Sequence, residues 1–210
     1  MTDLQKAKWD SVLQYALRKR RMIVCVIVVM ALVSLFAYVF RGITVNEIID
    51  GERCFIWGER EAQITLQIPV SALPQDIYEK GGHRFEENEV VVYQTDNTTI
   101  YLKQVMPANE GDDQLYFCFG LTYDLTEKGQ ILTIHRKVGE NEYTFHNGLS
   151  SDVLTDDRTS HEDAVHVRGY GPGENFMLYV DTEVCKAAEG TIRLEAYCWE
   201  IDYERQWPWS

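Results

Sequence analysis

The longest uninterrupted apolar segment of the chain lies close to its N-terminus, from Met22 to Phe40. It contains no charged residue, no proline and no glycine, and the four residues before it, 18–21, are all basic. As an α-helix, these nineteen residues span about 28 Å, close to the ~30 Å hydrocarbon core of a bilayer. Basic clusters stay on the cytoplasmic side of a membrane. The pattern therefore predicts a single transmembrane signal-anchor helix whose N-terminus is cytoplasmic.

Three other interpretations fit this segment less well. A cleaved signal peptide has an apolar stretch of only about 7–15 residues and a cleavage site with small residues, whereas 34–41 offers no good pair of small residues. A lipoprotein signal places its cysteine after the apolar run, but Cys25 lies near the start. A core helix of a soluble protein is rarely apolar on all sides and flanked by a dense basic cluster.

Beyond residue 41, apolar and polar residues alternate, which is the periodicity of β-strands. The clearest runs are 63–70, 115–123 and 191–198, and shorter β-rich runs occupy 90–94, 98–105, 130–138, 142–146, 164–170 and 175–180. Glycine- and asparagine-rich turn signals separate them. Only Ser71–Lys80 hints at a helical turn. About nine strands with short turns predict an all-β ectodomain, an antiparallel β-sandwich or jelly-roll-like fold.

The chain thus divides into a cytoplasmic segment (1–21), a transmembrane helix (22–40) and an extracytoplasmic domain (41–210). Trp9, Val12, Leu13 and Ala16 recur at helical spacing in the first segment, and no proline or glycine interrupts 1–41. One helix can therefore run from the cytoplasm through the membrane. Its amphipathic, basic beginning suits either the inner leaflet or a docked partner. The predicted location is the cell membrane, with a single pass.

Charge separates the two sides of this predicted membrane. Residues 1–40 carry a net charge of +4, and residues 41–210 carry −17. An acidic exterior of this size argues against nucleic acid and against an anionic lipid surface as partners. It favours solubility and contact with cations or basic partners.

Four cysteines lie in the predicted outer domain: Cys54, Cys118, Cys185 and Cys198. An even number on the oxidising side of a membrane indicates disulfides. If 175–185 and 191–200 form a hairpin, Cys185 and Cys198 are too far apart to bridge, because bridged Cα atoms lie within about 7 Å. We therefore favour a bond from Cys54 to Cys185 or Cys198, with free buried thiols as the alternative.

The densest polar segment is 150–166, which we expect to be a long acidic loop. Its carboxylates are hard oxygen ligands of the kind that Ca²⁺ prefers, although their spacing does not match an EF-hand and the alternative is a solvated loop. The candidate ligands are Asp152, Asp156, Asp157, Glu162 and Asp163. No other cofactor is expected, since the histidines and cysteines lack zinc-ligand spacing.

Aromatic residues cluster in the last strand and at the C-terminus. Aromatic side chains on a sheet face bind sugars or proteins when exposed, or pack as a second core layer when covered. The candidate binding residues are Tyr197, Trp199, Trp207 and Trp209. An Asn-x-Thr glycosylation sequon at Asn97 falls at a predicted loop tip.

Catalytic motifs are missing from the sequence, which contains no G-x-S-x-G, H-E-x-x-H or S-x-x-K. We therefore favour a membrane-anchored extracytoplasmic β-sandwich that binds or assembles with a protein or glycan partner. One alternative is an accessory subunit that contacts its membrane complex through the 1–41 helix. The other is a small membrane-anchored hydrolase using His161, His166 or the acidic loop.

Overall fold

The computed structural model describes residues 3–75, 77, 82–107, 113–139, 142–145, 149–154, 160–161, 165–167 and 175–207. Among them, the side chains of 3–17, 135, 143–145, 149–154, 160–161 and 165–167 lie outside the description. The chain forms two compact units. The first comprises Met1–Gly42 with Trp207–Ser210, and the second comprises Ile43–Gln206.

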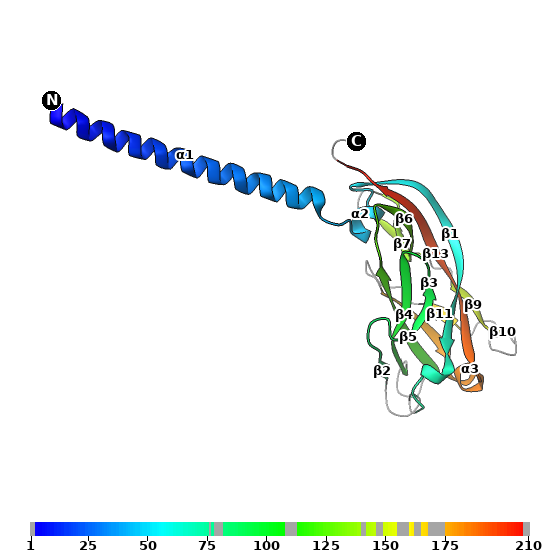
Figure 1. Cartoon of the computed structure of the whole chain (residues 1–210). Helices are drawn as coiled ribbons and strands as arrows, with labels where there is room; N and C mark the ends of the chain where they lie inside the picture. The colour runs from blue at the N-terminus through cyan, green and yellow to red at the C-terminus, as the bar shows by residue number, and fades with distance from the viewer. Residues whose placement is uncertain are drawn as a thin grey trace. The chain divides into compact units, whose positions relative to one another are not determined.

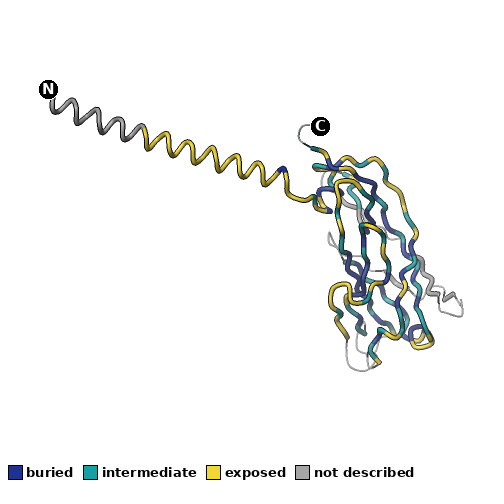
Figure 2. Tube along the Cα trace, in the orientation of Figure 1, coloured by how far each residue is buried: buried dark blue, intermediate teal, exposed yellow. Residues whose placement is uncertain are grey.

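The first unit is built on one helix, α1 (Asp3–Phe40). Its segment Arg18–Phe40 is long and apolar enough to cross a membrane. The described side chains of this segment are exposed on nearly every side, as Figure 2 shows along the helix. The helix ends in aromatic residues: Phe36 and Phe40 have ring centroids 4.2 Å apart, and the Arg41 guanidinium lies 5.2 Å from the Tyr38 ring. The predicted apolar helix is therefore present.

The second unit consists mainly of antiparallel β-sheets (Figure 1). One sheet is built around the two longest strands, β1 (Cys54–Pro69) and β13 (Thr191–Arg205). The other edge of β13 pairs with β6 (Lys128–Thr133) and β9 (Leu149–Leu154), and β10 (Ser160–His161) pairs with β9.

The second sheet runs in the order β11 (Val165–Val167), β12 (Asn175–Asp181), β5 (Gln114–Tyr123), β4 (Thr98–Pro107) and β2 (His83–Arg84). The strand β3 (Val91–Gln94) also pairs with β4. A separate hairpin joins β7 (His135–Lys137) to β8 (Tyr143–Phe145).

The main core lies on the faces of the two sheets that carry the predicted alternation. Ile64, Leu66 and Ile68 of β1 are almost completely buried. Cross-strand neighbours share a sheet face, so their partners Ala196, Leu194 and Ile192 on β13 join the same core. The second sheet contributes further buried residues to this cluster: Ile100, Leu102, Val105, Leu115, Phe117, Phe119, Leu121, Phe176, Leu178 and Val180. Burying one such side chain contributes about 1.5–3 kcal/mol.

A smaller core covers the opposite face of β13. Here Trp199, Ile201 and Tyr203 pack with the short helix α2 (Val45–Ile49). This helix begins at a capping box, in which the Thr44 hydroxyl accepts from the Glu47 backbone and the Glu47 carboxylate accepts from the Thr44 backbone. Sequence periodicity did not predict α2, because five residues are too few to show a helical stripe.

Several details differ from the sequence-based expectation. The predicted hairpin of 175–185 with 191–200 is wrong, because β12 and β13 lie in different sheets and are joined by α3 (Thr182–Ala187). The expected acidic loop contains β9 and β10. The described residues hold thirteen strands rather than about nine. The expected turn at Ser71–Lys80 begins as a 3₁₀ helix, η1 (Val70–Ala72).

Candidate functional site

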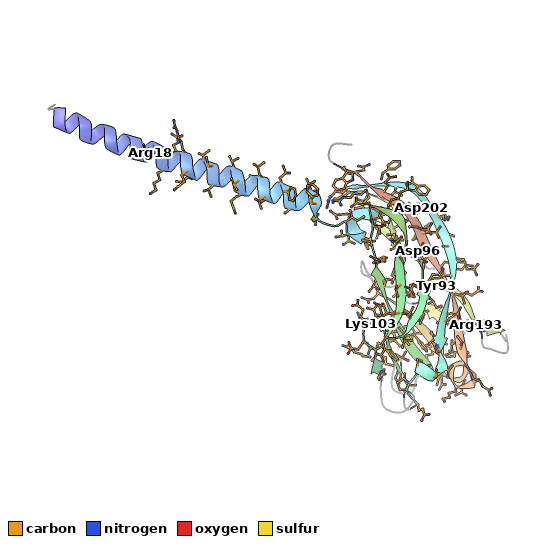
Figure 3. All side chains as sticks on the ribbon, viewed as in Figure 1. Arg18, Tyr93, Asp96, Lys103, Arg193 and Asp202 are labelled. Atoms are coloured by element: carbon orange, nitrogen blue, oxygen red, sulfur yellow. The ribbon has the colours of Figure 1, made fainter. Side chains whose placement is uncertain are left out.

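A pocket of about 520 Å³ opens in the Ile43–Gln206 unit. This volume lies within the usual range for small-molecule sites, about 300–1,000 Å³. It is lined by one exposed tryptophan and a set of polar residues: Trp57, Thr95, Asp96, Asn97, Lys128, Gly129, Gln130 and Asp202. These residues come from β1, the β3–β4 turn, β6 and β13. The side chains of Asp96 and Asp202 are labelled in Figure 3.

The pocket begins where the core-facing side of β13 changes from apolar to acidic. Ile192, Leu194, Ala196 and Cys198 occupy alternate positions in the main core. The next positions with the same parity are Glu200 and Asp202. Successive alternate residues of a strand share one face, so the polar pocket continues the face that carries the core.

A β-bulge places Trp57 at this pocket. The register of β1 against β13 shifts between Ile56 and Gly58, and Trp57 is the extra residue. Gly58 pairs with Asp202, and a Cβ at residue 58 would collide with the Asp202 carboxylate. The absence of a side chain at residue 58 therefore allows Asp202 to lie beside the bulge.

Asp202 is held by contacts to both of its carboxylate oxygens. The Gln130 Nε2 donates to Oδ1 at 2.8 Å, and the Arg60 Nη1 donates to Oδ2 at 3.3 Å. The Asp202 side chain is only 6% exposed. A buried carboxylate needs such partners, because an unpaired buried charge is strongly destabilising. Asp202 therefore presents a fixed acceptor rather than a mobile one.

The β3–β4 turn contributes Thr95, Asp96 and Asn97 to the pocket lining. The Thr98 backbone nitrogen donates to the Thr95 hydroxyl at 3.0 Å, and the Asn97 Nδ2 donates to the Asp124 carbonyl at 2.6 Å. The same Asn97 side chain lies against β6, where a Cβ at Gly129 would come within 2.6 Å of its Oδ1. With its neighbours fixed, Asp96 is left exposed at the turn, and it makes no hydrogen bond or ion pair with the rest of the described chain.

Trp57 is the large aromatic surface of the site. Its side chain is 55% exposed, although tryptophan is highly buried on average in folded proteins. The Lys128 ammonium lies 5.8 Å from the ring centroid and also pairs with Glu204 at 3.0 Å. Exposed aromatic groups beside fixed polar groups are characteristic of recognition sites.

The four candidate aromatic residues of the sequence analysis fall in different parts of the chain. Trp199 is 9% exposed and belongs to the smaller core, with the Arg136 guanidinium 4.0 Å from its ring. Tyr197 is half-buried and pairs with Gln63 on β1. Trp207 belongs to the other unit, where its ring lies 6.0 Å from that of Phe40, and Trp209 lies outside the described residues. The structure therefore indicates a packing role for Trp199.

The proposed calcium ligands lie largely outside the described part of the chain. The backbone of Asp152 belongs to β9, while Asp156, Asp157, Glu162 and Asp163 are not described. The two histidines of the hydrolase hypothesis have described backbones only. Within the described residues, no group of three or more histidine, cysteine or acidic side chains is arranged to hold a metal ion.

All four cysteines of the β-rich unit are described, and all are free and buried. Cys54 pairs with Arg205, which lies seven residues along β13 from Cys198, a separation of about 23 Å. Cys185 precedes the other end of β13, where Thr191 pairs with Pro69. The bond favoured from sequence, from Cys54 to Cys185 or Cys198, is therefore not formed, because Cys54 lies at the end of the β1–β13 pair that is remote from both.

Burial makes these thiols poor nucleophiles. Desolvation raises the pKa values of Cys185 and Cys198 from 9.0 to about 12, and a smaller rise at Cys185 comes from the Asp181 charge. The pKa values of Cys54 and Cys118 are also raised, mainly by burial. Because the thiolate is the reactive form, none of the four has the environment of a catalytic cysteine.

Comparisons with protein-family models, with curated proteins and with solved structures found no match to this chain. The chemistry of the pocket is therefore the basis on which a function is proposed below. Two sequence signals mark this pocket: the apolar-to-acidic change at Glu200 and Asp202 on the core side of β13, and the tryptophan–glycine pair at 57–58. Neither was recognised from the sequence, because the register of β1 against β13 was needed to bring them together.

Proposed function

We propose that this chain is a membrane-tethered binding protein whose β-sandwich domain engages a partner outside the cell through the Trp57 pocket. The observation that carries the proposal is a concave site in which a largely exposed tryptophan stands beside fixed polar side chains. Helix α1 acts as the anchor, and the Ile43–Gln206 unit acts as the recognition domain.

The anchor is supported by the surface of α1. From Met22 to Phe40, the apolar side chains have almost no protein cover, which is costly in water and favourable in lipid. Arg18–Arg21 lie at one end, and Tyr38, Phe40 and Arg41 lie at the other. Basic residues on the cytoplasmic side and aromatic residues at the interface are the usual flanks of a membrane span. In this orientation, the β-rich unit lies outside the cell.

A sandwich architecture is supported by the composition of the main core. Its buried residues come from β1 and β13 of one sheet and from β4, β5 and β12 of the other. Two sheets that share one core in this way are the basic arrangement of a β-sandwich. In the proposed molecule, the pocket lies where the inward face of β13 passes from this core to polar residues.

The hydrogen bonds and ion pairs of the side chains that line the pocket favour binding over catalysis. Asp202 has both oxygens engaged by Arg60 and Gln130. Asp96 is the lining carboxylate that stays unengaged, and no histidine, cysteine or serine lines the pocket to act with it as an acid–base or nucleophilic pair. The fixed acceptors and the aromatic face are suited to holding a ligand in one orientation.

Site-directed photo-crosslinking in intact cells tests the proposed function. Lys128 lines the pocket and pairs with Glu204, while Lys186 on α3 is similarly exposed and pairs with Glu183. With a benzophenone amino acid at residue 128 of the full chain, we expect a covalent adduct in the membrane fraction. The same group at residue 186 is the matched control. The absence of an adduct from residue 128, or equal adducts from both positions, would contradict the proposal.

A further inference from the structure

We infer that the Trp57 pocket binds a neutral sugar ring of a glycan. This inference rests on the proposed function, which it deepens by naming the class of ligand.

The aromatic surface is suited to one face of a pyranose ring. Several C–H bonds of such a ring point to the same side and carry partial positive charge, while the face of an indole carries partial negative charge. Trp57 offers this face because the bulge between Ile56 and Gly58 presents its side chain to the pocket. Stacking on Trp57 would remove apolar area from water on both partners.

The polar groups match what a sugar requires at its edge. Each sugar hydroxyl both donates and accepts a hydrogen bond, so a sugar site needs several acceptors and donors at fixed positions. Asp96 offers a carboxylate at the β3–β4 turn, Gln130 offers its amide oxygen, and Lys128 offers an ammonium donor. Gln130 is oriented because its Nε2 is bound to Asp202.

The charges of the lining favour a neutral ligand. Asp202 is paired with Arg60, Asp96 is a carboxylate without an ion pair in the described chain, and the one cation lining the pocket, Lys128, is paired with Glu204 outside it. An anionic sugar or a phospholipid phosphate would meet the Asp96 carboxylate and an ammonium that is already shared with Glu204. A lipid tail would require an apolar lining, whereas six of the eight lining residues have polar or charged side chains. These properties favour a neutral glycan over a membrane surface.

Saturation-transfer difference NMR on the full chain tests the inference. The protein is held in a polyoxyethylene detergent, because a detergent with a sugar headgroup would occupy the site. The probes are the methyl glycosides of glucose, galactose, mannose and N-acetylglucosamine, with methyl glucuronide as the anionic comparison. A ligand of this size is expected to bind with a dissociation constant on the order of 1 mM. We expect one or more neutral probes to receive saturation, strongest on one face of the ring.

Two neighbouring aromatic residues provide the matched variants. Trp57→Ala should weaken binding at least tenfold, and Trp57→Phe should retain part of it. Phe55 is 56% exposed on the same strand and does not line the pocket, so Phe55→Ala should leave binding unchanged. Trp57 belongs to neither core, and a thermal melt of each variant checks that the fold is kept.

The outcomes separate this inference from the proposed function. Binding of methyl glucuronide alone, no binding of any neutral probe, or unchanged binding by Trp57→Ala would overturn the inference. A residue-128 adduct with a partner that carries no glycan would overturn it while leaving the proposed function standing. A brominated-phospholipid quenching signal in vesicles that is lost in Trp57→Ala, without sugar binding, would assign the pocket to the membrane interface instead.

Discussion

The phenol oxygen of Tyr203 lies 3.2 Å from both the backbone nitrogen and the carbonyl oxygen of Thr126. It therefore accepts one hydrogen bond from the Thr126 backbone and donates another to it. Tyr203 is completely buried on β13, and Thr126 lies in the connection that leads into β6. This contact attaches the connection before the pocket strand β6 to the smaller core.

Tyr203→Phe removes both hydrogen bonds while preserving the ring. We expect the free energy of unfolding to fall by about 1–3 kcal/mol, because the Thr126 backbone groups lose their buried partner. Chemical denaturation of the full chain in detergent measures the change. Tyr179→Phe is a comparison on the second sheet, away from this connection. An unchanged midpoint for Tyr203→Phe would show that water satisfies Thr126 equally well.

Alkaline pH should destabilise the β-rich unit. The folded pKa values of Cys185 and Cys198 are about 12 against 9.0 for a free thiol, so the folded state binds protons that the unfolded state releases. The contribution of these two thiols to the free energy of unfolding is therefore fully present below pH 9 and is lost as the pH rises toward 12. The expected loss is about 1.4 kcal/mol per pH unit for each thiol in this window.

Denaturant midpoints between pH 8 and pH 10.5, with a reductant present, check this pH dependence. Cys198→Ala removes one of the two thiols and should make the fall in stability less steep, although it also lowers the stability at pH 8 by leaving a small cavity. An identical pH dependence in the variant would show that other groups are responsible.

Gly58→Ala should disturb the pocket and the sheet together. The added Cβ would collide with the Asp202 carboxylate, which Arg60 and Gln130 hold in place. We expect a loss of about 1–3 kcal/mol in the free energy of unfolding. Gly42→Ala is the matched control, since a Cβ there meets nothing within 4 Å. Equal stability of the two variants would mean that β1 relaxes away from Asp202 at little cost.

Membrane orientation is testable with introduced cysteines, because the four native thiols of the β-rich unit are buried. A membrane-impermeant maleimide should label Glu189→Cys in intact cells, where residue 189 is exposed beside α3. It should label Lys6→Cys only after the cells are permeabilised. The opposite pattern would reverse the orientation based on the basic residues 18–21.

Local patterns predicted the strands and the apolar helix, but they did not predict the pairing of distant strands. The alternation at Ile64–Ile68 and Ile192–Cys198 identified two strands, and each is longer in the structure than its periodic part. Polar residues such as Arg60 and Asp202 extend the strands because they pair across the sheet, which alternation alone cannot reveal. The incorrect β12–β13 hairpin was also predicted from local patterns, without knowledge of which strands pair. The preference for a Cys54 disulfide depended on that hairpin. Trp57 was not predicted as a site residue, because its position at the pocket results from a β-bulge that the sequence pattern does not reveal.

The pairing of the first long strand with the last one has a consequence for how the domain folds. The Arg53 carbonyl accepts from the Gln206 nitrogen, and fifteen residue pairs join β1 to β13 across more than 120 intervening residues (Figure 1). Contacts of such high sequence separation slow folding, because a long loop must close before they form. The sheet that contains β1 and β13 cannot be completed until residue 205 has left the ribosome. During synthesis, β1 therefore remains an unpaired strand, and its charged residues 59–61 reduce the risk of pairing with another chain.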